Sequence, residues 1–194
     1  MCNEVARRIS LGLMRDDFSQ LKIPLVFPEG LPNLAATESI RITDRTLIVL
    51  QGRNEAVVRR WSWTGPTGKP VFNYRSEGRR FKTGRCLIPV DAMYEFTSGV
   101  GPRKDKWRFE AADAPLFAIA GLWRAGVALG KDGRGEAFTM LTCAPGPDIA
   151  PYHDRQGVVL PREHWTEWLS PDEVDAEQLI APSPAGSFRV LPAG

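Results

Sequence analysis

The chain has 194 residues, 25 Lys and Arg against 23 Asp and Glu, and 43% hydrophobic residues, which is typical of a single globular domain over residues 1–194. This composition excludes a disordered chain and a collagen. No apolar stretch reaches the ~20 residues that a membrane span needs, and the start of the chain lacks the apolar segment of a secretion signal. We therefore expect a soluble, cytoplasmic monomer.

The predicted elements are mostly strands, with helices near the two ends. Residues 5–20 predict an amphipathic helix with Val5, Ile9, Leu13 and Phe18 along one side. Strands separated by Gly, Pro and Asp turns are predicted over residues 39–42, 46–50, 56–61, 85–96, 106–111, 116–123, 137–143 and 157–160. Two further helices, over 161–169 and 171–180, begin with Pro. We predict an α+β fold with a curled, barrel-like, mainly antiparallel β core and flanking helices.

The net charge of +2 hides an uneven distribution. Residues 41–108 carry 15 basic and 6 acidic groups, whereas residues 109–194 carry 6 and 12. Between residues 59 and 85, eight cations accompany a single acid, Glu77, and five aromatic residues. Cations and aromatic rings together are typical of a groove that binds single-stranded nucleic acid, although a solvated basic face is an alternative. Arg outnumbers Lys 19 to 6, which favours phosphate recognition.

Cys2 is the most informative residue. The initiator Met is normally removed before a small residue, which leaves an N-terminal cysteine with an amine of pKa ~7.7–8.0 beside a thiol of pKa ~8.5. The amine can serve as the base for the thiol in an N-terminal hydrolase. Alternatively, it can form a Schiff base with an aldehyde, which the thiol then closes to a thiazolidine ring. A cysteine without function at a frayed terminus is the third interpretation.

The other cysteines point to no special chemistry. Cys86 and Cys143 lie in apolar strands and are expected to be inert core residues. Three widely spaced cysteines and two scattered histidines support neither a disulfide framework nor a zinc site. We expect no metal and no organic cofactor.

Four polar residues stand at the ends of apolar segments or in the basic region. Glu95, between Tyr94 and Phe96, is either an exposed strand residue or a buried carboxyl group with a raised pKa, which suits general acid–base catalysis. His153 lies in a Pro-flanked loop before an apolar strand, where catalytic groups are common. Asn73 and Arg75 supply an amide and a cation suited to a sugar hydroxyl and a phosphate.

The order of several motifs resembles the SOS response-associated peptidase family. The resemblance runs from residue 1 to about residue 169 and rests on Met-Cys at the start, Asn-x-Arg-x-Glu at 73–77, Arg-Cys-Leu-Ile-Pro-x-x-x-x-Tyr-Glu-Phe at 85–96, Phe-Ala-Ile-Ala-Gly-Leu-Trp at 117–123, Phe-Thr-Met-Leu-Thr at 138–142 and His-Asp-Arg followed by Val-Val-Leu-Pro within 153–161. The family has a single α+β domain with a barrel-like sheet. Its members attach their N-terminal cysteine covalently to abasic sites in single-stranded DNA, and they have also been regarded as thiol autopeptidases.

The resemblance implies roles for individual residues. Cys2 would be the nucleophile, Glu95 the acid–base group, His153 the group that transfers protons and reverses the link, and Asn73 the residue that positions the cysteine or the sugar. The implied DNA contacts are Arg60, Trp61, Arg75, Arg85 and Arg155, and Thr142 and Glu77 would line the pocket.

Departures from the family pattern concern the hold on DNA. Asn3 and Glu4 follow Cys2, where members commonly have Gly-Arg, so an anion replaces a cation. Trp61-Ser62-Trp63 replaces the usual Trp-Gly-Leu, and Phe96 replaces a tryptophan. The four residues implied in chemistry are all present.

The leading hypothesis is covalent capture of abasic sites in single-stranded DNA through Cys2, by a protein that associates with the nucleoid when it is bound to damaged DNA. A cysteine N-terminal hydrolase or autopeptidase is the second hypothesis. The third is a diverged module that binds single-stranded DNA without chemistry and therefore shows salt-sensitive binding alone.

Overall fold

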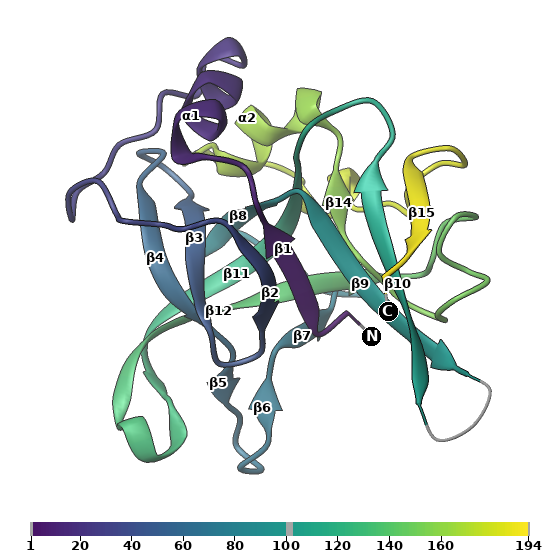
Figure 1. The fold of residues 1–194 in the computed structure, drawn as a ribbon. Helices are drawn as coiled ribbons and strands as arrows, with labels where there is room; N and C mark the ends of the chain where they lie inside the picture. Colours follow the sequence, from purple (N-terminus) through teal and green to yellow (C-terminus); the bar gives the residue numbers. More distant parts are fainter. Residues whose placement is uncertain (1, 100–102, 194) are drawn as a thin grey trace.

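The computed structural model describes residues 2–99 and 103–193, and its strands form two main sheets (Figure 1). All strand pairs of the first sheet are antiparallel. Its strands, in spatial order, are β15 (Phe188–Pro192), β10 (Lys104–Ala111), β9 (Ala92–Ser98), β1 (Glu4–Arg7) and β2 (Thr37–Arg41). The beginning of the chain therefore supplies an inner strand, β1, which is buried along its whole length.

The second sheet closes on itself. In spatial order its strands are β13 (Gln156–Gly157), β12 (Arg134–Cys143), β4 (Ala56–Trp61), β3 (Arg45–Leu50), β8 (Arg85–Val90), β11 (Phe117–Ala128) and β14 (Val159–Leu160), with β7 (Asn73–Arg75) beside β12. Because β11 also pairs with β12, the five strands β12, β4, β3, β8 and β11 form a ring. The pairs of β12 with β4 and β7 are parallel. A small hairpin joins β5 (Trp63–Thr64) to β6 (Pro70–Val71).

Alternating side chains divide most of the core between two large clusters. Leu47 and Val49 of β3 face the cluster that contains the helices, whereas Ile48 faces the cluster shared with the five-stranded sheet. The helices are α1 (Leu11–Gln20), α2 (Trp165–Leu169) and the 3₁₀ turns η1 (Gly130–Asp132), η2 (Arg162–His164) and η3 (Ala176–Leu179). Phe18 of α1 packs on Trp165 with ring centroids 4.9 Å apart. Within the described residues, no helix is long and apolar enough to cross a membrane.

The predicted α+β fold with a barrel-like antiparallel core is confirmed, but several elements differ. The strand predicted over 157–160 is divided into β13 and β14, and the helix predicted over 161–169 is the turn η2 followed by α2. The helix predicted over residues 5–20 is β1 followed by α1, because the Ser10 hydroxyl caps the helix by accepting from Leu13 N–H at 3.2 Å. Leu13, predicted on the apolar side, is 60% exposed. The strand predicted over 85–96 breaks at Asp91 into β8 and β9. The helix predicted over 171–180 is only the turn η3.

The predicted strand breaks at Asp91, whose carboxylate has partners in the two residues that follow β1. It accepts hydrogen bonds from the backbone of Arg8 and Ile9 and from Arg8 Nε at 2.6 Å. Arg8 also contacts Glu110 Oε1 at 2.7 Å. These contacts fix the carboxyl end of β1, and thereby the strand that carries Cys2 at its other end.

Candidate active site

Cys2 lies two residues before the first residue of β1, and it is only 1% exposed. Its carbonyl oxygen accepts a hydrogen bond of 2.8 Å from Nδ2 of Asn73, and its thiol donates to the carbonyl oxygen of Glu4 at 3.4 Å. Burial, together with the charge of Glu95, raises the pKa of the Cys2 thiol to about 12. The thiol is therefore neutral near pH 7, and its position is fixed by β7 and β1.

Asn73 reaches Cys2 because β7 runs parallel to β12, with Asn73 opposite Met140. Its Nδ2 donates to Cys2, whereas its Oδ1 is buried and has no hydrogen-bond partner among residues 2–99 and 103–193. A buried acceptor without a partner is costly and is common at functional sites. The oxygen of Asn73 is thus available to a polar group that enters beside Cys2.

Glu95 is buried, 3% exposed, in the middle of β9 opposite Trp107. The alternation of β9 places it on the same face as Met93, which packs in the core cluster shared by the two sheets. Burial and the charge of Asp154 raise the pKa of Glu95 to about 7, although a hydrogen bond from the Cys2 backbone acts in the opposite direction. Glu95 thus adjoins Cys2 and is ready both to donate and to accept a proton near neutral pH.

His153 belongs to a tight loop, in which its N–H donates to the carbonyl oxygen of Ile149 at 3.0 Å. Its Nδ1 accepts from the backbone N–H of Arg155 at 3.0 Å and also lies 2.8 Å from Oδ1 of Asp154, so the ring is held by the two residues that follow it. Burial lowers the pKa of His153. The neighbouring Tyr152 packs on Trp107, with ring centroids 4.9 Å apart, and this contact anchors the loop beside Glu95.

Glu95 and His153 line the same cavity, whose volume is about 560 Å³. The other lining residues are Asn3, Glu4, Arg41, Ile42, Phe96, Lys104 and Lys106. The cavity thus lies next to Cys2 and combines acid–base groups with several cations, which is a setting for chemistry on a small polar group.

Thr142 and Glu77, predicted to line the pocket, lie beside Arg155, predicted to contact DNA, and the three residues satisfy one another. Arg155 Nη2 donates to the carbonyl oxygen and hydroxyl of Thr142 at 2.7 and 3.0 Å. Both of its terminal nitrogens contact the Glu77 carboxylate, which lowers the pKa of Glu77. The cluster ties the loop after His153 to β12 and to the segment after β7.

Two residues predicted to bind DNA lie in the interior, so those two interpretations are wrong for this conformation. Trp61 is 0% exposed, donates through Nε1 to the carbonyl oxygen of Phe72 at 2.9 Å and stacks on Phe138. Arg85 is 0% exposed and donates to four carbonyl oxygens, those of Phe81, Lys82, Trp168 and Ser170. Neither side chain has a surface on which a base or a phosphate could bind.

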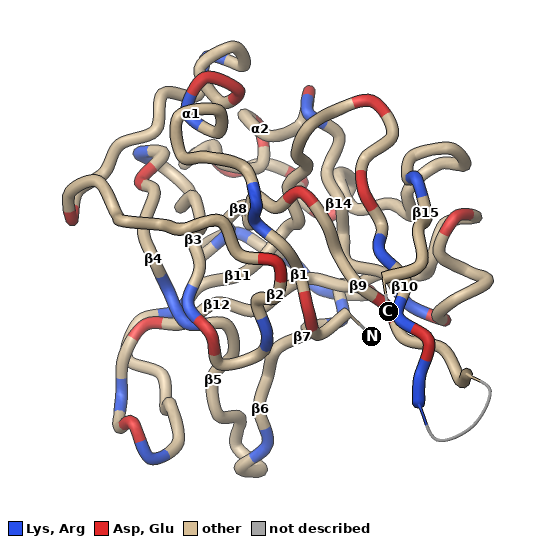
Figure 2. The backbone as a smooth tube through the Cα atoms, viewed as in Figure 1, with Lys and Arg blue, Asp and Glu red and all other residues tan. Residues whose placement is uncertain are grey.

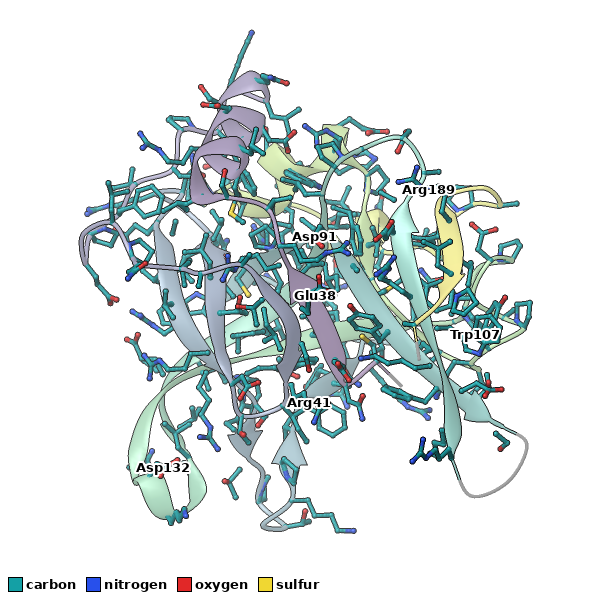
Figure 3. The ribbon with its side chains drawn as sticks, in the orientation of Figure 1. Glu38, Arg41, Asp91, Trp107, Asp132 and Arg189 are labelled. Atoms are coloured by element: carbon teal, nitrogen blue, oxygen red, sulfur yellow. The ribbon has the colours of Figure 1, made fainter. Side chains whose placement is uncertain are left out.

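The basic segment is partly neutralised in space. Figure 2 shows basic and acidic positions interleaved over the molecule. Arg60 contacts Asp132 at 3.0 Å, and Asp132 lies on the hairpin between β11 and β12 (Figure 3). Arg59 pairs with Glu29 and Glu136. By contrast, Arg75 is exposed and forms no ion pair within residues 2–99 and 103–193, so it is the predicted DNA contact that stays available.

The sequence prediction missed Arg41, Lys104 and Lys106, which line the cavity. They stand far from Cys2 in the chain, and only the register of β2, β1, β9 and β10 brings them to it. The buried anion that accompanies them, Glu4, was visible as a departure from the family pattern. In the part of the chain that the structure describes, no three His, Cys, Asp or Glu residues form a metal-binding group.

Comparisons with known proteins agree on one family. A model described as SOS response associated peptidase (SRAP) matches residues 33–193. The chain is 27% identical over 188 residues to the abasic site processing protein YoaM of Bacillus subtilis, with 84% of this chain and 78% of that protein covered. It is 28% identical over 183 residues to YobE, another abasic site processing protein of that organism, with 84% and 81% covered.

Solved structures show the same fold. A protein from Bordetella bronchiseptica superimposes with a TM-score of 0.76 and 21% identity, and all of both chains is covered. A protein from Bacteroides thetaiotaomicron superimposes with a TM-score of 0.66 and 18% identity over 82% of this chain and 79% of that one.

Proposed function

Since the chain belongs to the SOS response-associated peptidase family, we propose that it captures abasic sites in single-stranded DNA by a covalent bond to Cys2 once Met1 has been removed. The relatives named as abasic site processing proteins support an abasic-site function. The observation that carries the covalent step is the position of Glu95 and His153 at one cavity beside Cys2.

The reaction joins the aminothiol to the ring-opened sugar. The Cys2 amine adds to the C1′ aldehyde, and loss of one water leaves an imine. The Cys2 thiol then adds to the imine carbon while its proton passes to the nitrogen, which closes a thiazolidine ring. One C–N and one C–S bond form in total, and the sugar oxygen leaves as water.

Glu95 and His153 are the groups that can transfer the protons of these steps. A carboxyl group with a pKa of about 7 can protonate the departing oxygen and later accept the thiol proton. His153, which lines the same cavity, can pass a proton to the sugar oxygen during ring opening and can return protons when the link reverses. Asn73 holds the Cys2 carbonyl in place, so the amine and the thiol meet the aldehyde in a fixed orientation.

A thiol peptidase is less compatible with the same geometry. Attack on an amide needs a thiolate, and burial raises the pKa of the Cys2 thiol to about 12. The capture reaction starts from the amine, and it needs the thiol only after the imine has formed. The neutral thiol thus favours capture of an aldehyde over hydrolysis of a peptide bond.

The test is an oligonucleotide with one abasic site, mixed with the protein and separated under denaturing conditions. We expect a stable adduct with the unaltered chain and none with Cys2→Ala. Cys2→Ser keeps the amine but not the thiol, so its adduct should survive only after borohydride reduction. An equal, stable adduct in all three proteins would contradict the proposal, and a Glu95→Gln variant that forms the adduct at the normal rate would contradict the role of Glu95 in proton transfer.

A further inference from the structure

The outer face of the five-stranded sheet carries a row of charged and aromatic side chains. Glu4 of β1 stands opposite Arg41 of β2 and opposite Tyr94 of β9, and Lys106 of β10 stands opposite Phe96. Residues directly opposite one another, and residues two apart in a strand, point to the same side of a sheet. All five side chains therefore share one face. Figure 3 shows Arg41 at the end of β2 that lies beside the beginning of β1.

Lys106 is held in this row by two kinds of contact. Its Nζ donates to Oε1 of Glu4 at 2.6 Å and lies 4.0 Å from the ring centroid of Tyr94. Arg41 Nε lies 3.6 Å from the other oxygen of Glu4, whose side chain is only 4% exposed. The ammonium group is thus fixed before any ligand arrives, which lowers the entropy cost of binding one.

The row opens into the cavity that holds Glu95 and His153. Arg41, Lys104 and Lys106 line this cavity together with the two anions Glu4 and Glu95. The side chains of Lys106 and Arg41 are 22% and 67% exposed, so both can still reach a ligand. A fixed ammonium and a guanidinium beside a reactive cavity match the charge and the hydrogen-bond acceptors of a phosphodiester.

We propose that Lys106 and Arg41 bind a backbone phosphate of the DNA strand that enters the Cys2 cavity, and that Glu4 is a positioning residue for Lys106. The proposal rests on the proposed function for the identity of the ligand. It adds the route by which the strand reaches Cys2, across the outer face of β1 and β9. It also accounts for the anion at position 4, because Glu4 holds a cation that comes from β10.

The test measures equilibrium binding of a fluorescent single-stranded oligonucleotide that carries a tetrahydrofuran analogue of the abasic sugar. This analogue has no aldehyde, so binding is separated from the covalent step. We expect Lys106→Gln to raise the Kd about tenfold and to reduce the slope of log Kd against log salt by about 1. Lys106→Arg should retain most of the affinity. Lys22→Gln, in an exposed position after α1, is the control that should change nothing.

Arg41→Gln serves as a second variant, because this exposed side chain can be replaced without loss of the fold. It should also weaken binding and flatten the salt dependence. If Lys106→Gln and Arg41→Gln both bind with the Kd and salt slope of the unaltered chain, the phosphate subsite is wrong. A missing adduct with natural abasic DNA, despite these binding effects, would instead contradict the covalent function alone.

Discussion

The side-chain amide of Asn73 donates a hydrogen bond of 2.8 Å to the carbonyl oxygen of Cys2, and so joins β7 to the residue that precedes β1. The bond fixes the backbone of the residue whose amine and thiol are proposed to react. It also makes the position of Cys2 depend on the parallel pairing of β7 with β12.

The first prediction is that Asn73→Ala slows adduct formation by about 100-fold, because a small displacement of reacting groups has a large effect on rate. Stability should fall by only about 1 kcal/mol, the net contribution of one hydrogen bond. Single-turnover rates and urea unfolding measure the two effects. Asn73→Asp, which cannot donate from an ionised side chain, should be similarly slow; a normal rate in either variant would show that the bond does not position Cys2.

Local sequence predicted the elements whose residues carry their own signals. The strand over residues 56–61 has the predicted bounds, and Glu95 between apolar neighbours is buried with a raised pKa, one of the two alternatives left open. The failures concern long-range contacts. Trp61 beside Arg60 has the pattern of a DNA contact, but the stacking of Phe138 on Trp61 depends on the pairing of β4 with β12. The Glu4–Lys106 contact likewise depends on strand register that no local pattern contains.

The second prediction concerns Glu95 and pH. Its pKa is raised to about 7 in the folded protein, so the folded state binds a proton more tightly than the unfolded state. Its contribution to stability is therefore fully present below the unfolded pKa of ~4.3 and is lost as the pH rises to about 7. Glu95→Gln removes the group that titrates, so the variant should not lose this stability as the pH rises. Its free energy of unfolding, relative to that of the unaltered chain, should therefore increase by roughly 3 kcal/mol between the two pKa values.

Urea unfolding at several pH values measures the difference between the two proteins. Adduct formation should show an inflection near pH 7 that is absent in Glu95→Gln, since the carboxyl group is proposed to transfer protons. A constant difference in stability between the two proteins from acid to neutral pH would mean that Glu95 titrates normally.

The third prediction separates two arginines of the basic segment. Arg85→Met removes the donor to four buried carbonyl oxygens and should lower stability by about 3 kcal/mol or more, without changing the DNA affinity of the folded protein. Arg75→Gln should weaken DNA binding and leave the stability unchanged, because Arg75 is exposed at the end of β7. Urea unfolding and binding of single-stranded DNA distinguish the two. Weaker DNA binding by the folded Arg85→Met variant would show that Arg85 belongs to the protein surface that contacts DNA.

The fourth prediction tests the support of the His153 loop. A Cβ at Gly146 would lie 1.9 Å from the carbonyl oxygen of Ser183, and the Gly146 N–H donates to the buried Gln156 side chain at 2.5 Å. Gly146→Ala should therefore cost about 1–3 kcal/mol or more and should also slow adduct formation, as the loop shifts. Gly12→Ala in α1 meets only an ordinary contact and should stabilise the protein by up to about 1 kcal/mol. Equal effects of the two substitutions would contradict this view of the loop.

The fifth prediction concerns the charge of Glu4. Glu4→Gln keeps an oxygen that can accept from Lys106 but removes a negative charge beside the proposed phosphate, so the Kd for single-stranded DNA should fall about threefold at low salt. The gain should shrink between about 50 and 200 mM salt, because salt screens the lost repulsion. Glu4→Ala also loses the contact with Lys106 and should bind more weakly than Glu4→Gln. If Glu4→Gln and Glu4→Ala bind equally well, Glu4 influences DNA only through its charge and does not position Lys106.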